Sequence, residues 1–360
     1  MEMLLNVFDF EGEVLDIQPF GNGHINDTFL VKTTKQPYII QRINHHVFKQ
    51  PEQLMYNYRL VTTYLKERIQ ASGGNLHRET ISIIPTKDQR DFYVTKEGNY
   101  YRSITFIEDS ICLDTIKNAK DCFATGKTFG NFQALLEGFD ATKLYETIPN
   151  FHHTPKRFEA FLEALQKASP ERIENAQAEI EFIQSHQADI HALYDAHLPV
   201  KVTHNDTKLN NILFDKHDMR PLCVIDLDTI MPGFVANDFG DCIRSGATYS
   251  REDEPDLDKV TLDLDLYQNY LDGFIEGAKA TLTKEEIRSL PKGAKTITLE
   301  QAIRFLTDYL EGDHYYKIDY PQHNLVRTKT QIKLVKEMEK YQKEIDAMLQ
   351  KHLTCEKDEA

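Results

Sequence analysis

The 360-residue sequence predicts an α+β fold in two lobes, a small β-rich N-terminal lobe at residues 1–108 and a larger, mostly helical C-terminal lobe at residues 109–360. Three observations predict this arrangement. The chain is longer than a single hydrophobic core usually supports. Its first third contains short strand-like segments around one helical segment, and beyond residue 110 apolar residues recur at the three- and four-residue spacing of helices.

The expected strands of the first lobe are short segments that mix alternating and continuous apolar residues. The helical segment between them, residues 51–68, begins with a proline suited to a first turn. Leu54, Tyr58, Val61 and Leu65 follow at helical spacing. The strands are expected at residues 13–20, 27–33, 37–43, 81–86, 91–95 and 100–108. Together these elements predict a small sheet with one helix.

The second lobe is expected to be helical, with one β-hairpin. Two strand-like pieces, residues 211–214 and 221–227, are joined by the turn-like DKHDMR and have a cluster of polar residues at their open end. Helices are expected near residues 116–137, 156–167, 171–195, 257–278, 295–316 and 323–352.

Composition excludes several classes of function. The net charge of −15 opposes binding to a phosphate backbone, and the basic residues are scattered, so no nucleic acid partner is expected. No apolar run is long enough to span a membrane, and acidic residues lie where a signal peptide would be basic, so a cytoplasmic protein is expected. The five cysteines lack zinc spacing, which predicts free thiols without a structural metal. The oligomeric state stays open.

The stretch VTHNDTKLNNILFD, residues 202–215, contains the spacing that indicates chemistry. His204, Asp206 and Asn211 match H-x-D-x-x-x-x-N, the catalytic-loop spacing of protein kinases, in which the Asp accepts the acceptor's proton and the Asn holds Mg²⁺. Lys208 is placed to reach the phosphoryl group. Phosphoryl transfer requires metal ligands, a cation and an oriented hydroxyl more than a covalent nucleophile. Alone, the spacing also fits a polar loop with a capping Asp.

A second candidate metal ligand follows the hairpin's second strand, LCVIDLD, which ends in Asp226 and Asp228. Two neighbouring carboxylates repel each other unless a cation lies beside them, so we expect Mg²⁺ there; two solvated loop acids are the alternative. Asp226 is the better ligand candidate because it directly follows the apolar residues. Asp228, which faces the same side at a period of two, could serve a second metal or the loop.

Two more acids, Asp238 and Asp241, lie near the start of an expected helix in the segment 231–246. Acids favour a helix N-terminus and can accept hydrogen bonds from a neighbouring loop. We therefore expect them to brace the catalytic loop rather than to take part in the chemistry.

The loop GNGHIN, residues 21–26, has glycines at Gly21 and Gly23 that resemble the start of a dinucleotide-binding G-x-G-x-x-G motif. The third glycine position is Asn26, however, and a strand-like segment follows where a Rossmann unit requires a helix. The loop is better interpreted as a β-turn-β flap over the phosphates of ATP, with an ordinary hairpin turn as the alternative.

The sequence departs from protein kinases in the third strand, where a lysine that pairs with a helix glutamate is expected. This strand offers Gln41 and Arg42, and because neighbouring strand residues face opposite ways, only one of them can face the nucleotide. The phosphates would then depend more on metal, Lys208 and loop amides. The base, adenine or guanine, is expected at the backbone of the hinge formed by Thr105, Phe106, Ile107 and Glu108.

Together these motifs resemble the aminoglycoside phosphotransferase and choline kinase superfamily over most of the chain. The resemblance implies a bilobal protein-kinase-like fold and the use of ATP and Mg²⁺. The positions that match the superfamily pattern H-x-D-x-x-x-x-N … I-D-x-x-x-x-x-x-G-x-x-x-x-D are His204, Asp206, Asn211, Asp226, Gly233 and Asp238.

Five segments also resemble the bacterial N-acetylhexosamine 1-kinases, which phosphorylate the anomeric hydroxyl of GlcNAc and GalNAc: GNGHINDTFLV, KVTHNDTKLNNIL, VIDLDTIMPG, RFLTDYLEGDHYY and PQHNLVRTKTQIKLV. This resemblance implies Asp206 as the base for O1, Asn211 and Asp226 as Mg²⁺ ligands, and four residues around the sugar: His24, Thr229, Arg304 and Tyr315.

Structural alternatives exist for each sugar residue. Arg304 could be a snorkelling helix residue, Tyr315 a core residue, His24 a turn cap and Thr229 a turn hydroxyl. Two functional alternatives also stand: the same chemistry on choline, homoserine or an aminoglycoside, and a nucleotide-binding pseudokinase, suggested by the absent strand lysine. The preference between GlcNAc and GalNAc, and the acceptance of plain hexoses, stay open.

Overall fold

The computed structural model describes residues 2–21, 25–113, 115–116, 118–279 and 281–354. The chain forms two compact units. The first unit comprises Met1–Leu113, Gly138–Pro149 and Asn211–Pro232; the second comprises Asp114–Glu137, Asn150–Asn210 and Gly233–Ala360. The first unit therefore takes in two segments from later in the sequence, one of which is the expected hairpin. The lobe boundary at residue 108 stays a prediction.

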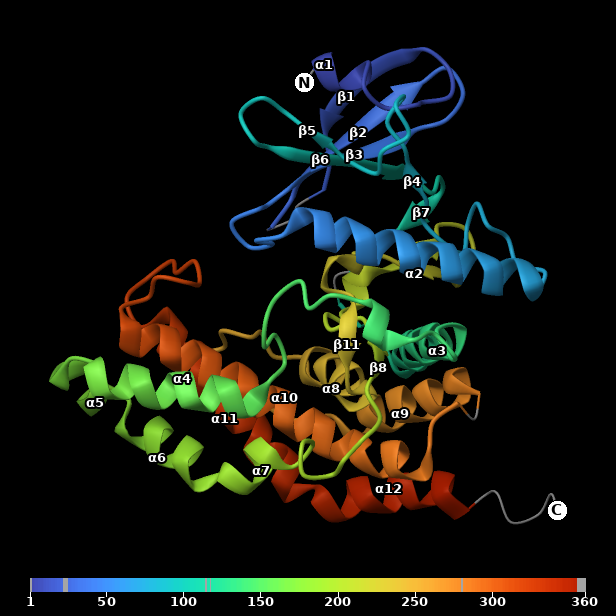
Figure 1. Ribbon diagram of the computed structural model, residues 1–360. Coiled ribbons are helices and arrows are strands. Elements are labelled where there is room, and N and C mark those ends of the chain that lie inside the picture. Colours follow the sequence, from blue (N-terminus) through green and yellow to red (C-terminus); the bar gives the residue numbers. More distant parts are fainter. Residues whose placement is uncertain (1, 22–24, 114, 117, 280, 355–360) are drawn as a thin grey trace. The chain divides into compact units, whose positions relative to one another are not determined.

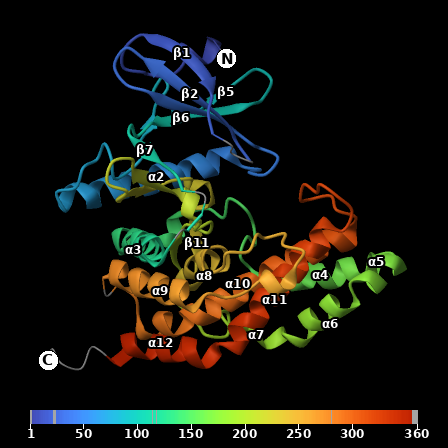
Figure 2. The same ribbon diagram turned by 180° about the vertical axis from the view of Figure 1, so that it is seen from behind.

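The first unit is built on an antiparallel sheet of six strands in its described part, with the order β1-β2-β3-β6-β4 and β5 paired with β6 (Figures 1 and 2). The predicted strands are all present, although the segments at 81–86 and 91–95 contribute only two paired residues each. The strands are β1 Val14–Pro19, β2 Asp27–Thr33, β3 Tyr38–Ile43, β4 Ile83–Ile84, β5 Tyr93–Val94 and β6 Tyr100–Thr105.

Side chains alternate between the two faces of this sheet. One face packs against the N-terminal segment, which includes α1 Glu2–Leu5, in a cluster around Phe8, Val31 and Ile40. The other face packs against α2 Pro51–Ala71, in a cluster that joins Ile43 to Leu54 (Figure 1). Pro51 occupies the first turn of α2, as the sequence predicts.

The first unit also contains the expected hairpin, formed by β9 Ile212–Asp215 and β10 Pro221–Val224, with β7 Ser110–Ile111 paired to β9. Short 3-10 turns in this unit are η1 Ala141–Lys143 and η3 Leu227–Thr229. The strand β11 Met231–Gly233 and the 3-10 turn η2 Leu209–Asn211 lie where the chain passes between the units.

The second unit is mostly helical in its described part. Its one short strand is β8 Lys201–Thr203, and its 3-10 turn is η4 Leu257–Lys259. Its helices are α3 Ala119–Leu135, α4 Thr154–Lys167, α5 Pro170–Asn175, α6 Gln177–Ser185, α7 Gln187–His191, α8 Val235–Gly246, α9 Leu264–Ala278, α10 Lys284–Glu311, α11 His323–Lys340 and α12 Gln342–Thr354.

The helix α10 is longer at its N-terminal end than the sequence analysis predicts. It begins at Lys284 because Thr283 and Glu286 form a reciprocal capping box, and it ends at Gly312, which has φ +110°. The predicted helix at 171–195 is instead three short helices that break at Ala176 and His186. The helix predicted at 323–352 breaks at Tyr341.

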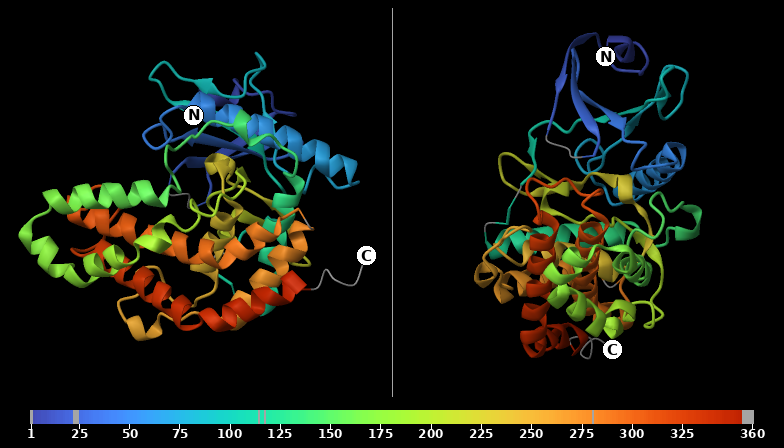
Figure 3. Two further views of the ribbon diagram at one scale, coloured as in Figure 1. Left: turned by 60° about the horizontal axis from the view of Figure 1, so that its bottom comes forward. Right: turned by 90° about the vertical axis from the view of Figure 1, so that its left-hand side faces the viewer.

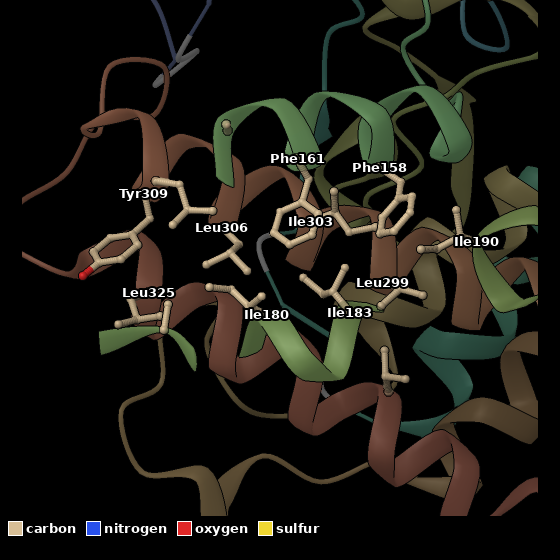
Figure 4. Packing of buried hydrophobic residues seen from close by; sticks show 14 residues of the cluster. Phe158, Phe161, Ile180, Ile183, Ile190, Leu299, Ile303, Leu306, Tyr309 and Leu325 are labelled. Atoms are coloured by element: carbon tan, nitrogen blue, oxygen red, sulfur yellow. The ribbon is translucent and has the colours of Figure 1, made fainter. Parts of the chain in front are cut away.

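The helices α4 to α7, green in Figure 3, lie beside α10, and a hydrophobic cluster that these helices share with α10 and α11 forms a core of the second unit (Figure 4). Phe161, Ile183 and Ile303 are fully buried within it. On another side of α10, Gly293 faces Gly240 of α8, where an added Cβ would lie 2.5 Å from the Gly293 carbonyl oxygen. This close approach fixes α8, which carries Asp238, against α10. Within the described residues, no helix combines the length and the apolar character that a bilayer span requires.

Candidate active site

The predicted catalytic loop directly follows β8 in the second unit. His204 is buried, and its ring lies edge to face with those of Phe129 and Phe132 on α3, each centroid 6.0 Å away. The Asp206 amide donates to His204 Nδ1 at 3.3 Å. Asn205 adopts φ +63°, the left-handed conformation that asparagine tolerates better than most residues, so the chain turns sharply just before Asp206. His204 is thus part of the loop's scaffold.

Asp238 on α8 holds the catalytic loop in place by accepting several hydrogen bonds. Its carboxylate accepts from the amides of His204 and Asn205 at 2.8 and 2.7 Å and from Gln133 Nε2 at 2.9 Å. Burial raises the pKa of the Asp238 carboxyl, and the charge of His204 and the two amide hydrogen bonds oppose that shift. The bracing contact expected for Asp238 is therefore present.

Lys208 lies beside the candidate base. Its Nζ is 2.5 Å from Asp206 Oδ1, and both side chains are partly exposed. Burial lowers the pKa of Lys208, but attraction to Asp206 and Asp241 outweighs it, so the pKa of Lys208 is raised and its ammonium stays charged. Asp241 itself accepts from Arg244 Nη2 at 2.9 Å. The loop therefore presents a carboxylate and a cation together.

A half-buried histidine and a buried glutamate support the same loop, and no motif in the sequence indicates them. His152 Nδ1 lies 2.9 Å from Glu300 Oε1, and its Nε2 lies 2.8 Å from the Asn205 carbonyl oxygen. Thr154 Oγ1 donates to Glu300 Oε2 at 2.7 Å. Burial lowers the pKa of His152, yet Glu300 and the Asn205 carbonyl raise it overall, and both ring nitrogens of the protonated form can donate to these oxygens.

This pair predicts a pH-dependent stability. The folded-state pKa of His152 lies above its ordinary 6.5, so its contribution is complete below about pH 6.5 and is lost as the pH rises through the folded value. We expect the Tm of the wild type to fall over that pH range. The part of this fall that comes from His152 should be absent in His152→Gln. Each kcal/mol lost lowers Tm by roughly 2–4 °C in domains of 150–250 residues.

His191→Gln, at an exposed helix position, is the matched control. Parallel Tm profiles for wild type and His152→Gln would contradict the expectation.

In the first unit, the hairpin brings the two candidate metal ligands to its open end. Asn211 precedes β9 and Asp226 follows β10, Val224 pairs with Ile212, and the Ile225 amide donates to the Asn211 carbonyl oxygen at 2.9 Å. Asn211 is buried and Asp226 is exposed, in a left-handed conformation with φ 61° and ψ 55°. Side-chain oxygens from an amide and a carboxylate are ligands that Mg²⁺ accepts, so this pair fits Mg²⁺ bound with a nucleotide.

Asp228 is engaged within the protein. Its Oδ1 pairs with Arg102 Nη1, and its Oδ2 accepts from Asn26 Nδ2 at 2.6 Å. Asn26 also accepts from the Asn44 amide at 3.0 Å. Both carboxylate oxygens of Asp228 therefore have partners within the protein. These contacts also explain why asparagine stands at the third glycine position of the GNGHIN loop.

Gln41 and Arg42 face opposite sides of β3, as strand geometry requires. Gln41 Oε1 accepts from Arg102 Nε at 2.9 Å and from Arg102 Nη2 at 2.7 Å. Arg42 instead pairs with Asp27 at 2.5 Å, and about half of each side chain is exposed. Gln41 therefore lies on the sheet face from which Arg102 pairs with Asp228.

The family comparison agrees with the catalytic-loop motif. A model of the phosphotransferase enzyme family matches residues 16–271, which is more than half of the chain. The chain belongs to this phosphotransferase enzyme family. The superfamily resemblance of the sequence motifs is thereby confirmed.

Solved structures of phosphotransferases show the same fold. An aminoglycoside phosphotransferase from Alicyclobacillus acidocaldarius is 12% identical with a TM-score of 0.60, over 93% of this chain and 94% of that one. A spectinomycin phosphotransferase, in complex with ADP and spectinomycin, is 15% identical with a TM-score of 0.57, over 94% and 97%. Plasmodium vivax ethanolamine kinase is 14% identical with a TM-score of 0.53, over 88% and 82%. The predicted protein-kinase-like bilobal fold is confirmed.

The phosphotransferase's expected nucleotide-binding residues lie in the first unit. Gly21 has φ +71°, whereas Gly23 and His24 lie outside the described residues. Phe20, which precedes the loop, packs its ring against Phe106 of the hinge at 5.5 Å. In the hinge, Thr105 Oγ1 accepts from the Ser82 amide at 3.0 Å, and the carbonyl oxygens of Ile107 and Glu108 accept from Ser110 Oγ and Arg78 Nη1 at 2.5 and 2.8 Å.

Two of the four expected sugar residues lie close together in the second unit. The Arg304 guanidinium lies 5.5 Å from the Phe151 ring centroid and 5.8 Å from that of Tyr316. The neighbouring Tyr315 is 69% exposed, so its interpretation as a core residue is wrong. Asp308 fixes this loop by accepting from the amides of His314, Tyr315 and Tyr316 at 2.9, 2.7 and 2.9 Å. Thr229 is buried and belongs to the first unit.

Another group of possible metal ligands in the second unit already contains a lysine. His186, Asp189 and Glu339 offer ligand atoms within 4.8 Å of one another. Lys295 Nζ lies 2.9 Å from Asp189 Oδ2 and 2.8 Å from Glu339 Oε1. An ammonium group thus already neutralises these acids.

Proposed function

We propose that this phosphotransferase uses ATP and Mg²⁺ to phosphorylate the anomeric hydroxyl of N-acetylhexosamines, GlcNAc or GalNAc, and releases the hexosamine 1-phosphate. The observation that carries the phosphotransfer chemistry is the braced loop on which Asp206 lies beside Lys208. The ADP in the related spectinomycin phosphotransferase supports ATP as the donor. The choice of sugar rests on the five segments that resemble N-acetylhexosamine 1-kinases.

In this proposal Asp206 accepts the proton of the acceptor hydroxyl as the oxygen attacks the γ-phosphorus. The Asp206 carboxylate, which lies beside the Lys208 ammonium, can accept this hydrogen bond and orient the hydroxyl. Lys208 compensates the negative charge that develops on the transferring phosphoryl oxygens. His204 acts through the loop, since its ring is buried against aromatic side chains.

Asn211 and Asp226 are the proposed Mg²⁺ ligands, and bound Mg²⁺ would neutralise charge on the β- and γ-phosphate oxygens. The nucleotide is proposed to contact the first unit, with its base at the hinge backbone. The flap residues Gly21 and Gly23 would cover the phosphates, with Gln41 or Arg42 of β3 nearby. Hinge contacts are proposed for Thr105, Phe106, Ile107 and Glu108.

Arg304, Tyr315, Thr229 and His24 are the proposed sugar contacts. Arg304 supports this role because its guanidinium lies near the Phe151 and Tyr316 rings instead of extending into solvent. Attraction to Tyr316 and Glu300 outweighs burial and raises the pKa of Arg304, so it presents a fixed positive donor. Exposed Tyr315 lies next to it, which is consistent with a sugar-binding surface in the second unit.

An acceptor panel tests the proposal against its alternatives. We expect ADP release with ATP, Mg²⁺ and free GlcNAc or GalNAc, and only background release with choline, homoserine or an aminoglycoside. Turnover with one of those three alone would keep the chemistry and change the acceptor. Nucleotide binding without turnover on any acceptor would favour the pseudokinase alternative, which the presence of Asp206, Asn211 and Asp226 argues against.

A further inference from the structure

A buried ion pair lies in the first unit at the back of the loop that carries Asp226. Arg102 on β6 and Asp228 pair through Nη1 and Oδ1, with 1% and 4% of their side chains exposed. Such pairs are costly to desolvate and are often replaced by apolar residues without loss of stability. A buried ion pair next to a functional loop therefore suggests a role in setting geometry.

Each nitrogen of the Arg102 guanidinium has a hydrogen-bond partner. Nη1 bonds Asp228, Nε and Nη2 bond Gln41 Oε1, and the Tyr58 ring on α2 lies 4.7 Å from the guanidinium carbon. Burial lowers the pKa of Arg102, and attraction to Asp228 reverses that shift. One side chain thus joins β3, α2 and the loop after β10.

Asp228, whose side chain is fixed, lies close to Asp226 along the chain. The two are separated by one residue, and Asp226 precedes the 3-10 turn Leu227–Thr229. Both Asp228 oxygens are held, one by Arg102 and the other by Asn26. Asp226 itself has a left-handed backbone, a strained conformation for most non-glycine residues that fixed surroundings help to keep. The fixed Asp228, two positions further along the chain, is placed to supply such a restraint.

We propose that Arg102 and Asp228 are positioning residues that hold the Asp226 carboxylate in its Mg²⁺-binding orientation. The proposal rests on the proposed function, in which Asp226 is a Mg²⁺ ligand. In protein kinases the corresponding ion pair joins a strand lysine to a helix glutamate, and movement of the helix breaks it. Here the cation comes from β6, the acid comes from the metal loop, and α2 contributes the Tyr58 ring. Arg102 thus supplies a buried cation beside the loop of Asp226, in a unit whose β3 carries no lysine.

The test measures ADP affinity by calorimetry with and without Mg²⁺, which needs no acceptor and no turnover. We expect Arg102→Lys and Asp228→Asn to reduce the Mg²⁺-dependent gain in ADP affinity by about 10- to 100-fold, the usual effect of removing a partner behind a metal ligand. ADP affinity without Mg²⁺ should change little. Arg90→Lys and Asp88→Asn, at an exposed ion pair of the same unit with 56% and 61% exposure, are the matched controls and should behave as wild type.

Asp226→Asn separates this inference from the proposed function. If Asp226→Asn keeps the Mg²⁺ effect, the proposed metal role of Asp226 is wrong and the positioning role falls with it. If Asp226→Asn loses the effect while folded Arg102→Lys and Asp228→Asn keep it, only the positioning role is overturned. Should the single variants fail to fold, the apolar pair Arg102→Met with Asp228→Leu replaces them, since such swaps often preserve folding. A folded apolar pair that keeps the Mg²⁺ effect also overturns the inference.

Discussion

Asp206→Asn should lower kcat by on the order of 10²–10⁴-fold, the contribution typical of a positioned general base. The substitution keeps the size of the side chain and removes the carboxylate that would accept the acceptor's proton. It also removes the charge that pairs with Lys208 at 2.5 Å. KM for ATP should change less than kcat, because the lost interaction belongs to the transition state.

Folding of Asp206→Asn should be preserved, because the loop's bracing contacts run through its neighbours. Asp238 accepts from the amides of His204 and Asn205, and His152 reaches the Asn205 carbonyl. Asp258→Asn, an exposed acid in the second unit, is the control for removing one negative charge. A folded Asp206→Asn variant with near-normal kcat would remove Asp206 from the role of base.

Asp226→Ala should abolish Mg²⁺-dependent turnover. Without this carboxylate only Asn211 remains of the two candidate ligands, and the charge that develops on the β- and γ-oxygens would be poorly neutralised. Initial rates measured across a Mg²⁺ titration would show the loss directly. An unchanged Mg²⁺ dependence would mean that another acid is the ligand, although Asp228 is already bonded to Arg102 and Asn26.

The left-handed backbone at Asp226 makes a second test variant at this position necessary. Its φ of 61° is tolerated by asparagine but strains alanine, so Asp226→Ala removes a charge and adds strain together. Asp226→Asn keeps the backbone preference and should raise the Mg²⁺ concentration needed for half-maximal rate. Asp218→Ala, an exposed acid in the turn at the other end of the same hairpin, should leave the titration unchanged.

The sequence was sufficient to predict the fold class and the residues that share a fixed spacing. Strand and helix periodicity indicated the sheet with α2, and His204, Asp206, Asn211 and Asp226 follow a local pattern. The residues that support them could not be found in this way. Arg102 lies 126 positions from Asp228, and His152 lies 148 positions from Glu300, so only the folded chain shows these contacts.

Helix ends were predicted less well for a related reason. Apolar spacing marks the face that packs, whereas a helix ends where capping groups are available. The Thr283 capping box starts α10 earlier than its apolar stripe indicates. Breaks at Ala176 and Tyr341 leave the apolar spacing continuous, which is why each set of short helices was predicted as one.

The site of phosphorylation on the sugar tests the central claim most directly. Free GlcNAc and GalNAc should be converted to products whose anomeric proton couples to phosphorus in NMR spectra. Their 1-O-methyl glycosides, which keep every other hydroxyl, should not react, because the methyl group removes the one proton that Asp206 would accept. An anomeric hydroxyl is also the most acidic on the sugar, which suits a carboxylate base. Phosphorylation of a methyl glycoside at a comparable rate would show that O3, O4 or O6 is the acceptor and would contradict the account.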